Sequence, residues 1–430
     1  MLRFSNQSHA ASYYAATAND TTRHAPLTGT LQVDVCVIGA GLTGISTALN
    51  LSERGYRVAV LEASKVGWAA SGRNGGQLIG GYACGTDTFA THMPTEDVAR
   101  VWAMGLEGVD IVRERVANHR IDCDLRFGYL HVANKPRDVV ALRQWCDEAQ
   151  RRFGYDKLRY IETGLMRDYV QSSRYRGGLF DPHSGHLHPL NYTLGLAHAA
   201  REAGAQIFED TRATRIRDEN GAHVIETDDG TVSAGFVVLA GNTWLGTLAP
   251  DLSRKIMPVG TYVIATEPLD PVRATALMPA QAAICDSRYA LDYFRPTPDG
   301  RVLWGGKVSY LTRAPAHLGE AMRRDMLKTF PQLEDVKVDY AWGGLVDITM
   351  NRAPHFGRIA PTVYFAQGFS GHGLNVTGLV GKLIAEAIGT QAERFDVFGK
   401  IRHRNFPGGH LLRTPMLALG MTWAKIRDLV

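Results

Sequence analysis

A glycine-rich turn between two predicted strands constrains the fold of this chain more than any other feature. Residues 39–44 read Gly-Ala-Gly-Leu-Thr-Gly, with glycine at the first, third and sixth positions. The turn follows an apolar run at residues 35–38, opens a predicted helix, and is followed by a second strand that ends in Glu62. This strand–helix–strand context predicts a Rossmann-like dinucleotide-binding unit, whereas the glycine pattern alone would be weak.

Each glycine of such a unit has a physical task, and so has the acidic residue that follows. Gly39 permits the tight turn, Gly41 lets the backbone approach a pyrophosphate, and Gly44 lets the helix pack close to the strand. The free N–H groups at residues 42–43 begin the helix and favour a phosphate. Glu62 can accept hydrogen bonds from ribose hydroxyls.

A second segment of small residues, at positions 69–77, favours FAD over a nicotinamide dinucleotide. Its glycines and alanines would let a flavin ring lie against the backbone, and Arg73, Asn74 and Gln77 would supply hydrogen-bond donors. A flexible surface loop is the alternative interpretation.

Two later turns are expected to approach the same ligand. Ala240 and Gly241 end an apolar strand, and the turn at residues 369–375 precedes a helix. The N–H groups of this turn could face the pyrimidine end of a flavin, where the reduced ring carries negative charge. His372 is a candidate for stabilising this charge, and a turn histidine bonded to the backbone is an equal alternative.

The composition excludes several classes of function. The formal net charge is +4, from 47 Lys and Arg against 43 Asp and Glu, which is too small an excess to indicate nucleic-acid binding. The five cysteines fit no zinc spacing, so we expect free thiols and no metal site. The sequence has no signal-peptide pattern and no run of ~18 apolar residues. We therefore expect a cytoplasmic protein without a membrane span, and we interpret residues 1–32 as an extended arm.

Longer segments, from the N-terminal arm almost to the C-terminus, carry a resemblance to a known family. Residues 70–77 (ASGRNGGQ), 185–191 (GHLHPLN) and 406–409 (FPGG) are the most specific of them. With these segments the chain resembles the D-amino-acid-oxidase-like superfamily of FAD enzymes, and within it the gamma-glutamylputrescine oxidoreductases.

The resemblance implies a mixed α/β fold, in which a Rossmann-like FAD-binding domain is interleaved with a substrate domain built on an antiparallel sheet. We expect the FAD-binding domain to be formed by residues 1–90, 185–255 and 341–430, and the substrate domain by residues 91–184 and 256–340. The implied FAD-binding residues are Gly39, Gly41, Leu42, Thr43, Gly44, Glu62, Ala63, Ser71, Gly72, Arg73, Asn74, Gly75, Gly76, Gln77, Ala213, Ala240, Gly241, Gly371, His372, Gly373 and Leu374. The chain has no cysteine after Cys285, so we expect FAD to be bound without a covalent link.

The resemblance also implies an activity. The terminal primary amine of a gamma-glutamylated diamine would be oxidised to an imine, which hydrolyses to an aldehyde and ammonia. In an oxidase, oxygen would accept the electrons and give hydrogen peroxide. Three alternatives stay open: an oxidase of glycine, sarcosine or D-amino acids, an amine dehydrogenase with another acceptor, and a flavin-binding protein without turnover. The sequence leaves the oligomeric state open.

A dry aromatic pocket would favour the neutral, reactive form of an amine substrate. The candidates for its walls, with a core position as the alternative for each, are Tyr262, Tyr293, Phe294 and Trp342.

Charged side chains are candidates for other contacts with the substrate. Arg295 and Arg352 could bind a substrate carboxylate, with ordinary ion pairs as the alternative. Lys307 could assist oxygen reduction, although it is more typical of a surface lysine. The basic, apolar stretch at residues 411–430 is expected to pack on the body, with a membrane surface as the less favoured alternative.

Overall fold

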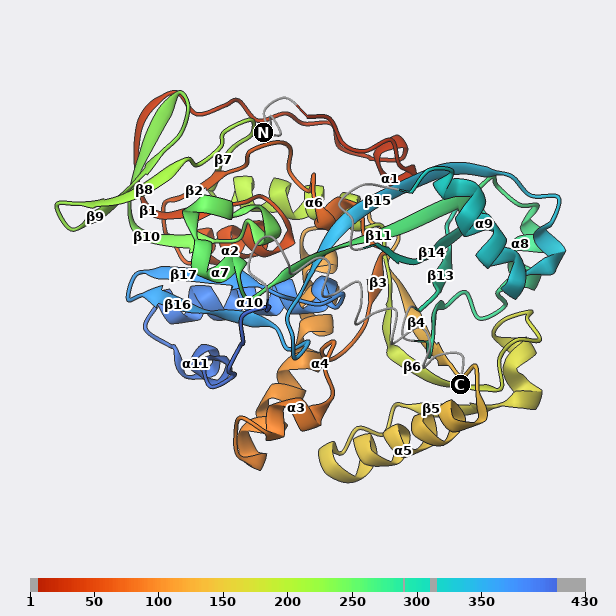
Figure 1. The fold of residues 1–430 in the computed structure, drawn as a ribbon. Helices are drawn as coiled ribbons and strands as arrows, with labels where there is room; N and C mark the ends of the chain where they lie inside the picture. Colours follow the sequence, from red (N-terminus) through yellow and green to blue (C-terminus); the bar gives the residue numbers. More distant parts are fainter. Residues whose placement is uncertain (1–6, 289–290, 310–314, 408–430) are drawn as a thin grey trace.

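The computed structural model describes residues 7–288, 291–309 and 315–407 and places two large β-sheets side by side (Figure 1). Within these described residues, the first sheet has eight strands and the second has nine. Lys307 lies in a described strand, but its side chain lies outside the described part of the chain, as does the whole stretch at residues 411–430. The expectations for those two features therefore stay predictions.

The first sheet has a parallel centre built from the apolar runs of the sequence. Its central order is β16-β17-β10-β1-β2-β7. In this order, each pair of neighbouring strands from β17 through to β7 runs parallel. A β8–β9 hairpin extends from β10. The strands are β1 (Gly29–Ile38), β2 (Val58–Leu61), β7 (Gln206–Phe208), β8 (Arg215–Glu219), β9 (Ala222–Glu226), β10 (Gly230–Leu239), β16 (His355–Ala360) and β17 (Val363–Gln367).

Helices cover this sheet in a tightly packed layer. Helix α2 packs against α6 and α10, and α10 packs against α4. A Cβ at Gly381 of α10 would lie 2.6 Å from the Ser46 Oγ of α2, so the two helices approach closely only because Gly381 lacks a side chain. The four helices are α2 (Leu42–Ser52), α4 (Thr95–Asn118), α6 (Pro189–Glu202) and α10 (Gly373–Ile388).

The second sheet has the order β15-β11-β14-β13-β12-β4-β6-β3, with β5 paired to β6. Neighbouring strands run antiparallel except β12 and β4, which are parallel. These two sheets confirm the predicted mixed α/β fold. The strands are β3 (Gln77–Leu78), β4 (Arg126–Val132), β5 (Arg159–Glu162), β6 (Gly177–His186), β11 (Met257–Thr266), β12 (Ala283–Asp286), β13 (Tyr293–Pro296), β14 (Val302–Ser309) and β15 (Val338–Ile348).

The domain boundaries given above remain our proposal. Strands β3 and β15 pair within the second sheet, although they lie wholly or largely in segments that we assign to the FAD-binding domain. The chain therefore passes between the sheets at these two strands, close to the site described below.

The second sheet has its own core, around Phe294 and Trp304, whose rings stack at 4.9 Å. The remaining helices are α1 (Tyr13–Ala16), α3 (Thr86–Ala90), α5 (Pro136–Phe153), α7 (Pro250–Ser253), α8 (Pro271–Leu277), α9 (Leu318–Thr329) and α11 (Glu393–Gly399). Short 3₁₀ turns are η1 (Ala70–Gly72), η2 (Thr163–Asp168), η3 (Asn242–Trp244), η4 (Gly246–Leu248) and η5 (Pro331–Leu333).

The interpretation of residues 1–32 as an extended arm is wrong in its middle part. Ser12 caps α1 by accepting a hydrogen bond from the Ala15 amide at 3.1 Å. Tyr14 is fully buried, with its ring edge-on to Trp342 at a centroid distance of 5.3 Å. Two adjacent tyrosines carry enough apolar surface to hold this segment in the core. The polar residues around them made the segment resemble an exposed arm in the sequence.

Candidate active site

A cavity of about 840 Å³ opens where the carboxyl ends of β1, β2, β10 and β17 meet the second sheet. In an open α/β sheet this edge is where ligands bind, because the loops after parallel strands converge there. Ile38, Leu61 and Ala240 line the cavity at the ends of their strands or directly after them.

The fingerprint turn forms one end of this cavity. Gly39 has φ +108°, and a Cβ there would lie 2.8 Å from the Ala240 carbonyl oxygen. A Cβ at Gly41 would lie 2.8 Å from Ser71 Oγ, and Ser71 Oγ accepts a hydrogen bond from the Leu42 amide at 2.9 Å. Thr43 also lines this end. The bare backbone at the start of α2 is therefore kept open toward the cavity, as a phosphate cradle requires.

Glu62 lies beside that cradle, where its carboxylate is already held by the backbone. It accepts hydrogen bonds from the Ala40 amide at 2.8 Å and from the Ser64 amide at 2.9 Å. Burial raises the pKa of Glu62, and these backbone donors oppose the rise. Ala63 and Ala213 line the same part of the cavity, so this end has room for the nucleoside of a dinucleotide.

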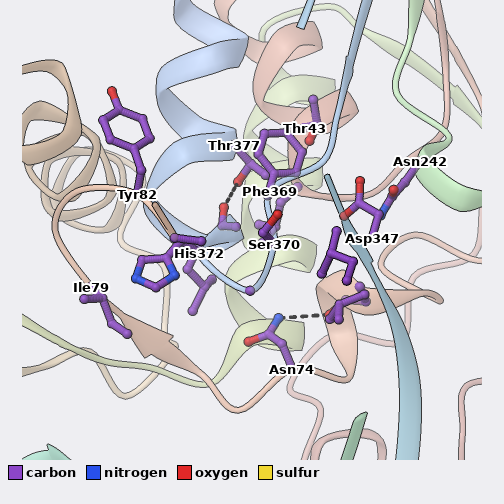
Figure 2. A pocket seen from close by; sticks show the side chains of 18 of the residues that line it. Thr43, Asn74, Ile79, Tyr82, Asn242, Asp347, Phe369, Ser370, His372 and Thr377 are labelled. Carbon is purple, nitrogen blue, oxygen red and sulfur yellow. Dashed lines mark hydrogen bonds between the residues drawn. The ribbon is translucent and has the colours of Figure 1, made fainter. Parts of the chain in front are cut away.

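The segment at residues 69–77 divides into lining and supporting residues. Its lining members are Ala69, Ala70, Ser71, Asn74, Gly75 and Gln77. Figure 2 shows Asn74 bonded within its own loop, where its Nδ2 donates to the carbonyl oxygens of Ala70 and Ser71.

The structure places four predicted FAD-binding residues behind the cavity wall. The guanidinium of Arg73 donates to the Trp68 carbonyl at 2.7 Å and lies over the Trp68 ring. A Cβ at Gly72 would clash with the carbonyl oxygen of Gly67, and a Cβ at Gly76 would clash with the carbonyl oxygen of Leu187. Gly44, likewise, packs against the Gly39 carbonyl. These residues shape the wall through close backbone packing.

Tyr293 is the predicted aromatic residue that reaches the cavity. A Cβ at Gly75 or at Gly305 would overlap its ring, so the two glycines hold the ring in a narrow slot. Burial raises the pKa of Tyr293, and the phenol therefore stays neutral.

The other predicted wall aromatics lie in the protein core. Tyr262 is 3% exposed and belongs to the core of the second sheet, as does Phe294. Trp342 is also 3% exposed, and its Nε1 donates to the Arg73 carbonyl at 3.0 Å. For these three side chains the alternative interpretation, a position in the protein core, is therefore the one that the structure shows.

His372 lines the cavity at the start of α10, with Gly371, Gly373 and Leu374 beside it. Burial, together with nearby His131 and Arg352, lowers the pKa of His372 to about 4. The imidazole is neutral at pH 7, so the positive potential at this turn comes from the free N–H groups of the helix. In Figure 2 the His372 ring lies on the side of Ile79 and Tyr82, opposite Asp347 and Asn242.

Asp347 is a cavity residue that the sequence did not single out. It is 3% exposed, accepts a hydrogen bond from the Gly368 amide, and burial raises its pKa to about 6. An acidic residue near the end of the largely apolar strand β15, shortly before a turn, was the available signal.

The two candidate arginines are in different places. Arg352 lines the cavity. Arg295 is 2% exposed and lies behind the wall, where it donates to the Gly75 carbonyl at 3.0 Å and to Tyr14 Oη at 3.2 Å. Arg295 is therefore not accessible as a clamp for a substrate carboxylate.

Beyond His372 and Tyr293 the cavity continues into a space between α4, α5, β4 and β6, which we call the outer chamber. We define it by its lining residues Trp102, Tyr129, His131, Glu148, Phe153, Tyr155 and Asp181. These elements lie close together in the sequence, between residues 95 and 186, but they carry no local motif, so sequence reasoning missed the outer chamber.

The arrangement of side chains and helices bears on metal binding and on membrane spans. No group of three or more His, Cys, Asp or Glu side chains within the described residues is arranged to hold a metal ion. Over the same described ranges, no helix combines the length and apolar character needed to cross a bilayer.

Residues 34–387 match the family of FAD dependent oxidoreductases known as DAO. The chain belongs to this family. It is 42% identical to gamma-glutamylputrescine oxidoreductase of Escherichia coli strain K12, over 98% of both chains. It is 40% identical to the probable oxidoreductase OrdL of Haemophilus influenzae, over 100% of this chain and 99% of that one.

Solved structures of the DAO family share this fold. Glycine oxidase from Geobacillus kaustophilus superposes with a TM-score of 0.73 at 22% identity, over 87% of this chain and 100% of that chain. Glycine oxidase from Bacillus cereus gives a TM-score of 0.72. The protein is therefore an FAD-dependent oxidoreductase with the DAO fold.

The residues present fit FAD. The start of α2 offers the bare backbone that a pyrophosphate needs, and Glu62 and Ala213 line the space beside it. Gly75, Gln77 and the start of α10 line the opposite end, where a flavin ring would lie.

Proposed function

We propose that this DAO-family enzyme oxidises the terminal primary amine of gamma-glutamylputrescine or a related gamma-glutamylated polyamine. The products would be an aldehyde, ammonia and hydrogen peroxide, formed with oxygen as the electron acceptor and one water molecule consumed. The observation that carries the proposal is the single cavity that joins the FAD cradle, Tyr293, His372 and the outer chamber. The similarity to the Escherichia coli enzyme supports this choice of substrate.

FAD, when bound, supplies the two-electron acceptor for oxidation of the carbon–nitrogen bond. The start of α2 would bind its phosphates, Glu62 would bind its ribose, and the cavity-lining members of residues 69–77 would hold its ring system together with the start of α10. Cys84 and Cys285 line the cavity as protonated thiols, because burial raises the pKa of each to about 12. Two unreactive thiols support our proposal that FAD is held without a covalent link.

The cavity residues prepare the amine for oxidation by desolvating it. An alkylammonium group has a pKa near ~10.4 in water, and transfer to an apolar cavity favours its neutral form. Tyr293 and Ile79 contribute apolar surface near the expected position of the ring. His372 is neutral at pH 7, so it can accept a hydrogen bond from an amine N–H without adding charge.

The test is a peroxide assay on the purified enzyme with a panel of amines. The panel contains gamma-glutamylputrescine, gamma-glutamylated longer polyamines, free putrescine, glycine, sarcosine and D-amino acids. We expect peroxide and ammonia in equal amounts, with the highest kcat/KM for a gamma-glutamylated amine. A higher kcat/KM for glycine, sarcosine or a D-amino acid would overturn the proposed substrate.

The acceptor is tested separately, by mixing the anaerobically reduced enzyme with air. Rapid return of the oxidised flavin spectrum supports an oxidase, and a reduced flavin that persists in air would identify a dehydrogenase.

We also propose a cytoplasmic location, which the five free cysteines support.

A further inference from the structure

Asp181 on β6 is a buried carboxylate that lines the outer chamber. It is 7% exposed. Its Oδ1 accepts hydrogen bonds from Tyr155 Oη at 2.7 Å and from the His183 amide at 3.0 Å, and its Oδ2 accepts one from Ser184 Oγ at 2.5 Å. Within the described chain, every hydrogen bond to this carboxylate thus comes from an uncharged donor.

Within the described residues, no cationic side chain forms a hydrogen bond or an ion pair with Asp181. Burial raises the pKa of Tyr155, and Asp181 raises it further, so this phenol stays protonated and donates. Burial also lowers the pKa of His131, which leaves the chamber imidazole without charge at pH 7. Buried charges are usually paired with an opposite charge. For Asp181 a ligand in the outer chamber can supply the missing cation.

The walls of the outer chamber suit an alkylammonium chain. Trp102 and Phe153 stack at a centroid distance of 4.3 Å with an interplanar angle of 11° and line the chamber together. Aromatic faces attract ammonium groups and accept methylene chains. Glu148, the other chamber carboxylate, differs from Asp181 because it pairs with Arg152.

We propose that Asp181 is the counter-ion of a second ammonium group on the substrate, the one that is not oxidised. This inference rests on the proposed function, in which the amine to be oxidised lies at the flavin. In a gamma-glutamylated diamine the second ammonium is the α-ammonium of the glutamyl group. Asp181 is then a specificity residue that selects substrates with two cationic nitrogens.

The test compares two substrates that differ only in this group. N-glutarylputrescine is gamma-glutamylputrescine with the α-ammonium replaced by hydrogen. The wild-type enzyme should prefer gamma-glutamylputrescine by about 30-fold or more in kcat/KM, because loss of one partner from a buried charge pair costs at least that much. Equal use of the two substrates by the wild type would overturn the proposal without any variant.

Asp181→Asn should remove this preference. It should lower kcat/KM about 30-fold or more for gamma-glutamylputrescine, mainly through KM, and change the value for N-glutarylputrescine less than about threefold. The matched control is Asp110→Asn, because Asp110 is a nearby, half-exposed carboxylate paired with Arg113. It should retain the wild-type preference. FAD content and Tm report on the folding of both variants. An equal loss for both substrates in Asp181→Asn would overturn the proposal.

A binding measurement separates this inference from the proposed function. Changes in the flavin spectrum, recorded without oxygen, give Kd for 1,9-diaminononane, whose two nitrogens are as many bonds apart as the amine and the α-ammonium of gamma-glutamylputrescine, and for nonylamine, which has one ammonium fewer. If gamma-glutamylated amines are not substrates, the proposed function fails, and this pair still decides the role of Asp181. Weaker binding of the diamine in Asp181→Asn, with unchanged nonylamine binding, supports the role, and equal effects on both ligands overturn it.

Discussion

The Nε of Arg295 donates a hydrogen bond to the carbonyl oxygen of Gly75 at 3.0 Å. Gly75 lines the FAD cavity, and Arg295 lies directly behind it on β13. The same guanidinium donates to Tyr14 Oη, so one side chain joins the N-terminal helix, the second sheet and the cofactor segment. No carboxylate forms an ion pair with Arg295 among the described residues, which leaves its positive charge beside the cavity wall.

We expect Arg295→Met to weaken FAD binding about tenfold or more, because the Gly75 carbonyl loses the donor that fixes it. The substitution should change the free energy of unfolding less. It leaves hydrogen-bond acceptors without a donor, which destabilises the fold, but it also removes a buried charge, which offsets this loss. FAD fluorescence on dilution measures the dissociation. Arg143→Met is the control, because its pair with Glu162 is exposed. Full FAD retention by Arg295→Met would show that Gly75 is held by its neighbours alone.

The phosphate cradle predicts the behaviour of Gly41→Val. The branched side chain would enter the space beside Ser71 Oγ and cover the backbone at the start of α2. We expect the variant to purify as a colourless, folded apoprotein, judged by the absorbance near ~450 nm that flavins give and by circular dichroism. Gly319→Ala is the control, because a Cβ there meets only ordinary contacts at 3.7 Å and beyond. A yellow Gly41→Val protein with full FAD occupancy would refute the cradle.

Glu62→Gln removes one of the two carboxylate oxygens that accept backbone amides. Either the Ala40 or the Ser64 amide then faces an NH₂ group, and the ribose loses a charged acceptor. We expect FAD affinity to fall about 10- to 100-fold, since hydrogen bonds to charged groups contribute ~1.5–3 kcal/mol each. Equilibrium dialysis against FAD measures this change. Exposed Glu202→Gln on α6 should bind FAD as the wild type does.

Buried histidines predict how stability depends on pH. Burial lowers the pKa of His186 and His188 to about 3, against an ordinary value of 6.5. Between about pH 3 and 6.5 the unfolded chain therefore binds more protons than the folded chain, so the free energy of unfolding falls as the pH falls through this window. His186→Gln should flatten the slope by up to ~1.4 kcal/mol per pH unit in urea titrations of the holoenzyme. His198→Gln, at an exposed histidine, should leave the slope unchanged. An unaltered slope in His186→Gln would show that this histidine is protonated in the folded state.

Local motifs predicted the cofactor end of the site because its physics is local. The turn at residues 39–44 and the small residues at 240–241 and 371–374 each follow a strand or begin a helix, and the carboxyl ends of parallel strands share one edge. The sequence therefore located the cavity before its shape was visible.

The substrate end could not be predicted in the same way. On an antiparallel strand alternate residues face opposite sides, and the sequence does not state which set faces the cavity. On β11, Val259 and Thr261 line the cavity, and Tyr262 points into the core. On β13 it receives Tyr293, and Phe294 points into the core. The outer chamber depends on how α4, β4, α5 and β6 pack together, and this packing leaves no local motif in the sequence.

The discontinuous cradle has a consequence for the order of events during synthesis. Its walls come from Gly41, Ser71, Ala240 and Leu374, so a ribosome must deliver most of the chain before the last wall exists. Until α10 emerges, the sides of α2 and α4 that it covers stay exposed to water. Capture of the cofactor is therefore a late step, and a yellow colour in a nascent chain would report that nearly the whole protein has been assembled.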